Sequence, residues 1–168
     1  MSELVQFAPA IVLTVLGGAL VGLVSARLAR TGPLLGMATG MSVGVILGIT
    51  LSPTGPIPEV GSLIDGCDLR RWGPGTLDEL LTIGEASLNV ALFMPLGACL
   101  GFHSRPAARR LGLIAAGTVP FLIELIQLKV PTLGRYCDSV DITHNELGLL
   151  MGFAAGTVAL WLGRKVRK

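Results

Sequence analysis

The chain has 168 residues, of which 51% are apolar and only 14% are charged, and its 13 basic and 11 acidic side chains give a net charge of +2. Soluble domains carry about a quarter charged residues, and disordered chains are polar and poor in aliphatic side chains. The composition therefore excludes a disordered chain. It also argues against a soluble enzyme, which could not bury so much apolar surface in so small a body.

Five apolar segments have the length of a membrane-spanning helix, about 20 residues. They cover residues 5–26, 34–51, 86–102, 111–130 and 143–163. The sequence therefore predicts an all-α membrane protein with five transmembrane helices in a single domain, residues 1–168. Pro95 and Pro120 predict kinks in the third and fourth helices. We interpret the first segment as a span rather than a signal peptide, because residues 1–6 carry no basic side chain.

The basic residues alternate between the connections. Nine of them, with no acid, follow the first span, separate the third from the fourth, or follow the fifth: Arg27, Arg30, Arg105, Arg109, Arg110, Arg164, Lys165, Arg167 and Lys168. All eleven acids fall on the other side or in that end of the spans, with only four basic residues. The positive-inside rule then predicts an outer N-terminus, a cytoplasmic C-terminus and a long outer loop between helices two and three.

Glycines recur at every fourth position in several spans, which places them on one helix face. The stripes are Gly36, Gly40, Gly44 and Gly48, then Gly148, Gly152 and Gly156, with shorter pairs at Gly18 and Gly22 and at Gly97 and Gly101. Small residues at this spacing let helix backbones approach closely in lipid. We therefore predict close helix packing rather than a pore lined by glycine.

The long outer connection, residues 52–85, contains a helix signal. Thr76 and Glu79 have the spacing of a capping box, and Leu77, Leu80 and Leu81 follow at helical spacing. Two interpretations stay open. The segment is either a short helix lying on the outer leaflet or an extension of the third span.

Two of the three cysteines lie on the predicted outer, oxidising side. Cys67 is in the long connection and Cys137 precedes the fifth span, whereas Cys99 lies inside the third span. The compartment favours a Cys67–Cys137 disulfide, with Cys99 left as a buried thiol. Metal ligation is disfavoured, because no CxxC or Cys/His spacing supports it.

Polar side chains gather near the outer ends of spans three to five. Those on the third span are four residues apart and those on the fourth are three apart, so each pair shares a helix face. Polar groups inside a membrane are costly and are usually functional or paired. The candidate ligand-binding site therefore comprises Glu85, Asn89, Glu124, Gln127, Arg135, Asp138, Asp141 and Asn145.

Each member also has a structural interpretation. Asp141 would cap the fifth span, and Thr143 with Glu146 would form a second capping box. Arg135 would pair with Asp138. The amides would form interhelical hydrogen bonds of about 0.6 kcal/mol each.

The segment from Asn89 to Gly97 has the pattern N-x-x-x-F-x-P-x-G and resembles the VanZ-like family of membrane proteins. The downstream run resembles the same family's second block: Glu124-x-x-Gln127, then Arg135-x-x-Asp138-x-x-Asp141-x-x-x-Asn145-x-x-Gly148-x-x-x-Gly152. The motif-bearing core covers residues 85–152, and the first two spans match only in hydropathy. Cys137 and His144 stand where many members have an apolar residue.

The resemblance implies a bacterial multi-pass cell-membrane protein, from a family named for a member linked to low-level teicoplanin resistance. Our leading hypothesis is a pocket that binds or remodels an amphiphile with an anionic or hydrogen-bonding head, such as a lipid-linked envelope precursor or a lipoglycopeptide. Arg135 would meet anionic oxygen, the amides would orient the head, and Glu124 would hold Arg135 or carry a proton.

Two other classes of function stay open. One is an enzyme that acts on a lipid phosphate through a divalent metal held by Glu124, Asp138, Asp141 and His144. The other is a structural scaffold that assembles through its glycine stripes with a partner or with a second copy. We expect no cofactor. Nucleic-acid binding is not supported, because the basic clusters fit topology signals and anionic lipid.

Overall fold

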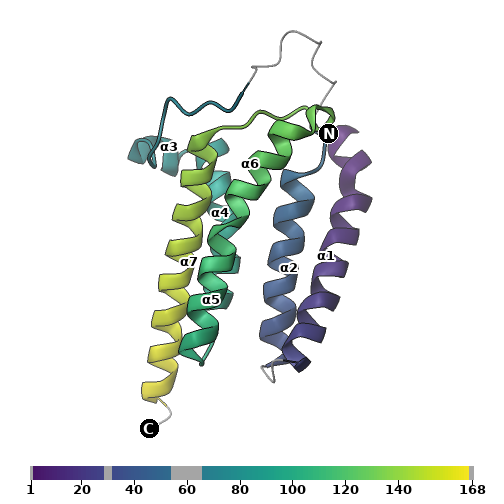
Figure 1. Ribbon diagram of the computed structural model, residues 1–168. Coiled ribbons are helices and arrows are strands. Elements are labelled where there is room, and N and C mark those ends of the chain that lie inside the picture. Colours follow the sequence, from purple (N-terminus) through teal and green to yellow (C-terminus); the bar gives the residue numbers. More distant parts are fainter. Residues whose placement is uncertain (1, 29–31, 54–65, 167–168) are drawn as a thin grey trace.

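The structure is a computed structural model that describes residues 2–28, 32–53 and 66–166. It consists of helices α1 (Ser2–Leu28), α2 (Pro33–Thr50), α3 (Leu77–Leu81), α4 (Glu85–Gly101), α5 (Pro106–Gly117), α6 (Val119–Lys129) and α7 (Ser139–Val166), with a 3-10 turn at Pro131–Leu133 (Figure 1). In these residues the one β feature is an isolated bridge between Asp68 and Asp138. The predicted all-α fold is confirmed.

Four helical stretches are long and apolar enough to cross a membrane: Pro9–Arg27, Pro33–Thr50, Pro106–Lys129 and Ser139–Val166. α4 is apolar but has only 17 residues. The predicted spans therefore coincide in position with α1, α2, α4, the joined α5 and α6, and α7. A fifth crossing and the sidedness of the chain stay predictions.

The fourth predicted span is interrupted near Pro120, where a kink was expected. α5 ends at Gly117 and α6 begins at Val119, with Thr118 donating its N–H to the Ala115 carbonyl over 3.3 Å. Pro120 lacks an N–H, so it cannot continue the helical ladder. Pro95 behaves differently, because α4 continues through it without a break.

Two helices begin several residues before their predicted starts. α5 begins at Pro106 rather than at residue 111, and α7 begins at Ser139 rather than at 143. Charged residues, among them Arg109 and Asp141, occupy the added turns. A search for uninterrupted apolar runs stops at such residues, whereas the backbone hydrogen bonds of the helix continue through them.

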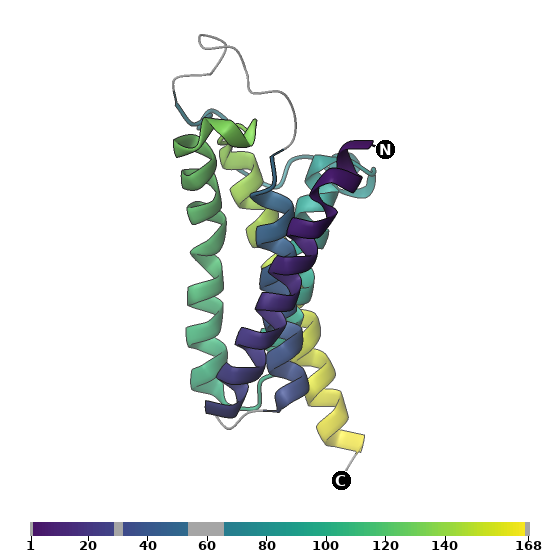
Figure 2. The same cartoon turned by 90° about the vertical axis from the view of Figure 1, so that its right-hand side faces the viewer.

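The glycine stripes face one another in two close helix pairs, α1 with α2 and α4 with α7. Figures 1 and 2 show the ribbons of α1 and α2 next to each other. A Cβ atom at Gly40 would overlap the carbonyl oxygen of Gly18. In the second pair, a Cβ at Gly152 would overlap the carbonyl oxygen of Met94. Backbone therefore packs on backbone, which confirms packing as the role of these stripes.

The two helix pairs meet where α2 packs on α4, and α5 and α6 pack against α4 and α7. A buried apolar cluster fills the centre: Ile46, Phe93, Leu96, Leu100, Ala116, Ile123 and Leu149. Phe93 and Leu149 are fully buried there. The cluster fixes how the ends of these helices lie relative to one another.

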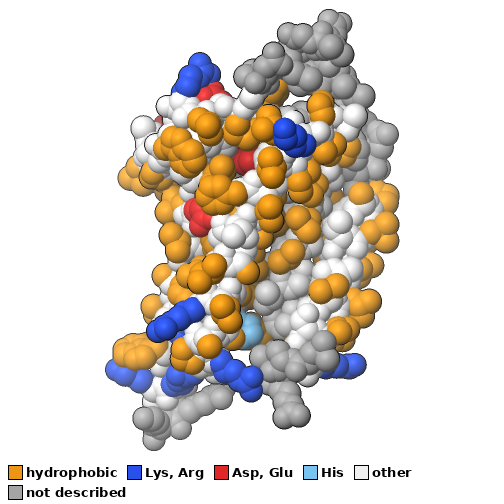
Figure 3. Space-filling view, in the orientation of Figure 1, with side chains coloured by type: hydrophobic (Ala, Val, Ile, Leu, Met, Phe, Trp, Pro, Cys, Tyr) orange, Lys and Arg blue, Asp and Glu red, His pale blue; other side chains and the backbone are white. Residues whose placement is uncertain are grey.

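Charge is distributed unevenly along the bundle. In Figure 3, most of the visible Lys and Arg side chains lie toward the end that carries the C-terminus, and the visible Asp and Glu side chains lie in the opposite half. We refer to these as the basic end and the acidic end. Several charged residues counted in the sequence lie outside the described residues: Arg30, Glu59, Asp65, Arg167 and Lys168.

The short helix α3 lies at the acidic end and is separate from α4. Glu79 Oε2 accepts from Thr76 N over 3.0 Å, and Glu79 N donates to Thr76 Oγ1 over 3.3 Å. The predicted capping box is confirmed. Residues 82–84 interrupt the helix before Glu85, so the segment is not an extension of α4.

Candidate functional site

The described part of the long connection is fastened to the start of α7. Cys67 and Cys137, the pair singled out from the sequence, are joined by a disulfide with their Cα atoms 4.6 Å apart. Beside it, Asp68 N donates to the Cys137 carbonyl over 2.9 Å, and Ser139 N donates to the Asp68 carbonyl over 3.0 Å. The Ser139 hydroxyl also donates to the carbonyls of Asp68 and Arg71.

The same connection continues over the first turns of α7. Thr143 Oγ1 bonds the Gly73 carbonyl over 2.9 Å, and His144 Nε2 lies 3.2 Å from the Pro74 carbonyl. Thr143 also bonds Val140 inside the helix, so the capping box predicted for Thr143 and Glu146 is wrong. A carbonyl partner requires the proton on His144 Nε2.

Asp138, rather than Asp141, caps α7. Asp138 Oδ1 accepts from Val140 N over 2.8 Å just as the helix begins. The cap predicted at Asp141 is therefore wrong, because this residue lies inside the first turn. Asp141 Oδ1 instead accepts from Asn89 Nδ2 over 2.7 Å. That bond joins α4 to α7 at the acidic end.

Glu124 is buried beneath the start of α7, with 3% of its surface exposed. Its Oε2 atom accepts from Asp138 N over 2.8 Å. Charge-assisted bonds from backbone N–H groups are the usual way to satisfy a buried carboxylate. Glu124 therefore positions the chain that carries Asp138.

Arg135 binds the carboxyl end of α2. Its Nη2 and Nε atoms donate to the carbonyls of Ile49 and Ser52, over 2.7 and 3.3 Å. The last carbonyls of a helix lack partners and carry partial negative charge, which suits a guanidinium group. Arg135 forms no ion pair within 4 Å with a described acid, so the pairs expected with Asp138 and Glu124 are not formed.

Two further amides were expected at the site. Gln127 Nε2 donates to the Thr50 carbonyl over 3.0 Å, which adds a second clamp on the end of α2. Asn145 is 2% exposed, and its Oδ1 atom has no hydrogen-bond partner among the described residues. Gln127 thus joins α6 to α2, and Asn145 lies in the interior of the bundle.

Two polar pockets open at the acidic end. The helix-side pocket has a volume of about 460 Å³ and is lined by Ile49, Glu85, Leu88, Asn89, Gln127, Gly134, Arg135, Tyr136, Asp138 and Asp141. The loop-side pocket has a volume of about 400 Å³ and is lined by Asp68, Arg70, Arg71, Glu79, Glu85, Ala86, Asp138, Val140, Asp141 and His144. Glu85, Asp138 and Asp141 line both, so the two pockets adjoin.

Carboxylates outnumber cations in both pockets. The loop-side pocket has five acids against two arginines, and the helix-side pocket has three acids against Arg135. Arg70 offsets part of this charge, because its guanidinium hydrogen-bonds Asp68 and lowers the pKa of that carboxyl to about 2. The adjoining pockets therefore form a region of negative potential.

Six of the eight residues predicted for the site line the helix-side pocket, and Glu124 and Asn145 line neither pocket. Sequence reasoning missed the loop-side contributors Asp68, Arg70, Arg71 and Glu79. Their spacing in the sequence gives no signal, because they lie about 60 to 70 residues from Asp138. The predicted disulfide could have found them, since it brings residue 67 to residue 137.

The acids do not form a metal-binding arrangement. Within residues 2–28, 32–53 and 66–166, no three His, Cys, Asp or Glu side chains converge so that they could hold a metal ion. The ligand set that the enzyme hypothesis requires, Glu124 with Asp138, Asp141 and His144, is therefore not assembled. The geometry gives that hypothesis no support.

A family model described as VanZ/LLP1 matches residues 35–161, from the beginning of α2 to the last third of α7. No curated protein and no solved structure matches the chain. The family match includes every residue of the two motif blocks and both polar pockets, and it covers well over half of the chain. The chain is a membrane-type helical protein and belongs to the VanZ/LLP1 family.

Proposed function

We propose that this protein spans the bacterial cytoplasmic membrane several times and binds the head of an amphiphilic cell-envelope molecule in the two adjoining pockets. A lipid-linked envelope precursor and a lipoglycopeptide of the teicoplanin type both have the required form, a polar head on an apolar tail. Capture of the lipoglycopeptide would reduce its access to targets in the envelope, which is a route to glycopeptide resistance.

The observation that carries the proposal is a hollow polar region at one end of an otherwise apolar bundle. Pockets for small ligands have volumes of about 300–1,000 Å³, and each of the two pockets falls in that range. Apolar side chains of the helices below are exposed, among them Leu88 at the rim and Leu125 on α6. An amphiphile would thus find a polar site beside a lipid-facing surface.

The charges favour a head rich in hydrogen-bond donors. The shared wall presents Glu85, Asp138 and Asp141. Asn89 and Gln127 use their amide N–H groups on protein acceptors, which leaves their carbonyl oxygens as acceptors for a ligand. Amine and hydroxyl groups of a ligand would donate hydrogen bonds to these carboxylate and amide oxygens.

Arg135 adds a place for one anionic or carbonyl oxygen. Its Nε and Nη2 atoms bind the end of α2, whereas Nη1 takes part in neither bond. The guanidinium group is therefore held in place while one donor group is still available at the helix-side pocket. A head that carries an amine beside an oxyanion matches this arrangement better than a purely anionic head does.

The test uses Glu85, which lines both pockets and whose carboxylate forms no hydrogen bond with the described residues. We expect Glu85→Gln to weaken binding of teicoplanin to the protein in lipid nanodiscs by about 10- to 100-fold, because a hydrogen bond to a charged group contributes about 1.5–3 kcal/mol. Asp78→Asn is the matched control, since Asp78 is an exposed acid of α3 that lines neither pocket.

Binding is measured by calorimetry, and a lipid-linked peptidoglycan precursor serves as the second probe. The proposal requires that at least one probe binds and that Glu85→Gln weakens its binding while Asp78→Asn does not. Equal loss in both variants would point to general charge attraction, and unchanged binding in Glu85→Gln would place the ligand elsewhere.

A further inference from the structure

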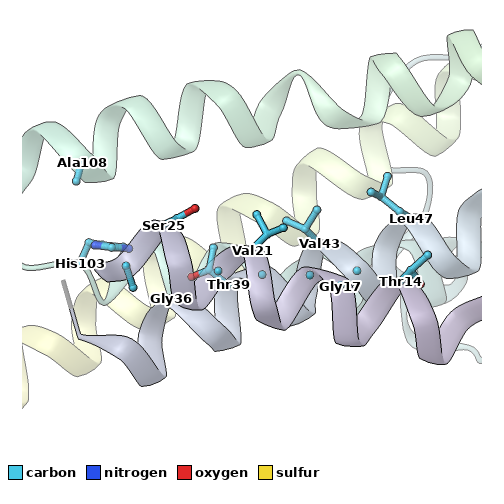
Figure 4. A pocket seen from close by; sticks show the side chains of 15 residues that line it. Thr14, Gly17, Val21, Ser25, Gly36, Thr39, Val43, Leu47, His103 and Ala108 are labelled. Carbon is cyan, nitrogen blue, oxygen red and sulfur yellow. The ribbon is translucent and has the colours of Figure 1, made fainter. Parts of the chain in front are cut away.

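An apolar groove of about 650 Å³ runs along the α1–α2 hairpin, away from the polar pockets. Its floor consists of glycines and aliphatic residues, including Gly17, Val21, Gly40 and Val43. His103 and Ala108 line one end of it, and Thr14 and Leu47 line the other (Figure 4). The groove therefore extends from the connection between α4 and α5 toward the acidic end.

The groove has almost no polar group to offer a ligand. Thr14 Oγ1 donates to the Ile11 carbonyl, and Thr39 Oγ1 donates to the Leu35 carbonyl, each over 2.8 Å. These two hydroxyls are thus satisfied inside their own helices, and the other polar side chains of the lining, Ser25 and His103, lie at the opposite end from Thr14 and Leu47 (Figure 4). A cavity without polar partners does not hold water or a polar solute, so the remainder of the groove suits a hydrocarbon.

Its length matches the depth of one membrane leaflet. The lining residues of α1 run from Thr14 to Ala26, which at about 1.5 Å per residue corresponds to about 18 Å. Half of a bilayer core of about 30 Å is about 15 Å, the depth that one acyl chain occupies. A single chain would therefore fill the groove from end to end.

Charge indicates which kind of lipid head would lie at the end of the groove that His103 and Ala108 line. Arg27 follows the last lining residue of α1, and Arg105 lies two residues after His103. The segments that line the groove, residues 14–26, 36–47 and 103–108, contain no acid. Figure 3 likewise shows Lys and Arg side chains gathered at the basic end. Such clusters attract anionic lipid heads, by about 1 kcal/mol for each basic residue near the surface.

We propose that the groove binds one acyl chain of an anionic phospholipid whose phosphate lies at the basic end of the bundle. The site is independent of the polar pockets, which lie at the other end. The lipid would fill the space between the α1–α2 hairpin and α5. It would thereby hold the hairpin, which Gln127 and Arg135 clamp at the acidic end, along the rest of its length.

Gly17 provides a test that leaves the helix packing intact. A Cβ at Gly17 meets no atom within 4 Å, so Gly17→Leu fills the groove without displacing backbone. Gly163→Leu is the matched control, because Gly163 also has no neighbour within 4 Å and lies on α7 outside the groove. Both changes replace a helical glycine by a good helix former.

The probe is phosphatidylglycerol with a photoreactive diazirine on its acyl chain, in nanodiscs of phosphatidylcholine. We expect cross-links to concentrate on groove residues of α1, α2 and α5, and to fall at least fivefold there in Gly17→Leu but not in Gly163→Leu. The same diazirine on phosphatidylcholine should label the groove at least threefold less. Far-UV circular dichroism verifies that both variants keep their helix content.

Three results would overturn the proposal. The first is labelling of the outward face of α1, where Leu13, Leu16 and Leu20 are more than half exposed, equal to labelling of the groove. The second is equal labelling by the two lipids, and the third is a groove occupied by a second copy or another protein. Glu85→Gln should leave groove labelling unchanged, so failure of this site and failure of the polar pockets are distinguishable.

Discussion

Replacement of Gly152 by alanine tests the close backbone contact between α7 and α4. A Cβ at this position would overlap the Met94 carbonyl oxygen and would lie under 3 Å from Met94 C and Ala98 N. All three are backbone atoms, so the helices must separate to accept one methyl group. Overpacking of this kind costs about 1–3 kcal/mol.

The matched change is Gly163→Ala, where the new methyl group meets nothing within 4 Å. Alanine is favoured over glycine in a helix by about 1 kcal/mol, and this gain applies to both variants. The difference in unfolding free energy between the two variants therefore isolates the packing cost. We expect Gly163→Ala to be the more stable by about 1–3 kcal/mol.

The assay is reversible unfolding in mixed micelles of dodecyl maltoside and sodium dodecyl sulfate, followed by far-UV circular dichroism. Gly152→Ala should also weaken ligand binding, because the bond between Asn89 and Asp141 crosses the same helix pair. The reasoning is refuted if the two variants unfold with free energies equal within about 0.5 kcal/mol, the usual error of such comparisons.

Three further predictions concern the acidic end. Cys67→Ser should lower the unfolding free energy by up to about 4 kcal/mol, measured without reductant, because the disulfide closes a loop with a sequence separation of 70. Asp68 has its pKa lowered to about 2, so the stability it contributes is complete above about pH 4 and is lost as the pH falls toward 2. Trp72 fluorescence in a Trp161→Phe background should follow this transition. Arg70→Gln should move the midpoint of the transition up toward the ordinary pKa of an aspartate. Gln127→Leu should cost about 1–3 kcal/mol in the same micelle assay, since it leaves a buried helix-end carbonyl without its partner.

Periodicity and composition were enough to predict the positions of the long helices and the faces on which their glycines lie. A bilayer-length apolar run and a glycine at every fourth residue are both local patterns. The capping box at Thr76 and Glu79 is equally local, and the structure has it where the sequence placed it. The starts of α5 and α7 were misplaced, because Arg109 and Asp141 interrupt the apolar run without interrupting the helix.

The partners of the polar residues were harder to foresee. Arg135 was expected to pair with an acid but binds the end of α2, more than 80 residues earlier in the chain. Helix-end carbonyls are acceptors that no side-chain pattern reveals. Sequence spacing showed that polar groups converge at one end, whereas their individual bonds depend on how α2 and the loop lie in three dimensions.

The short length of α4 has a consequence for the surrounding membrane. Its 17 residues extend over about 25 Å at 1.5 Å per residue, whereas the 28 residues of α7 extend over about 42 Å. If α4 makes the predicted fifth crossing, a bilayer core of about 30 Å must thin locally around it, and a mismatch costs fractions of a kcal/mol per Å. Lipid heads would then descend toward Glu85 and Asn89, so that access to the pockets becomes easier in a thinner membrane.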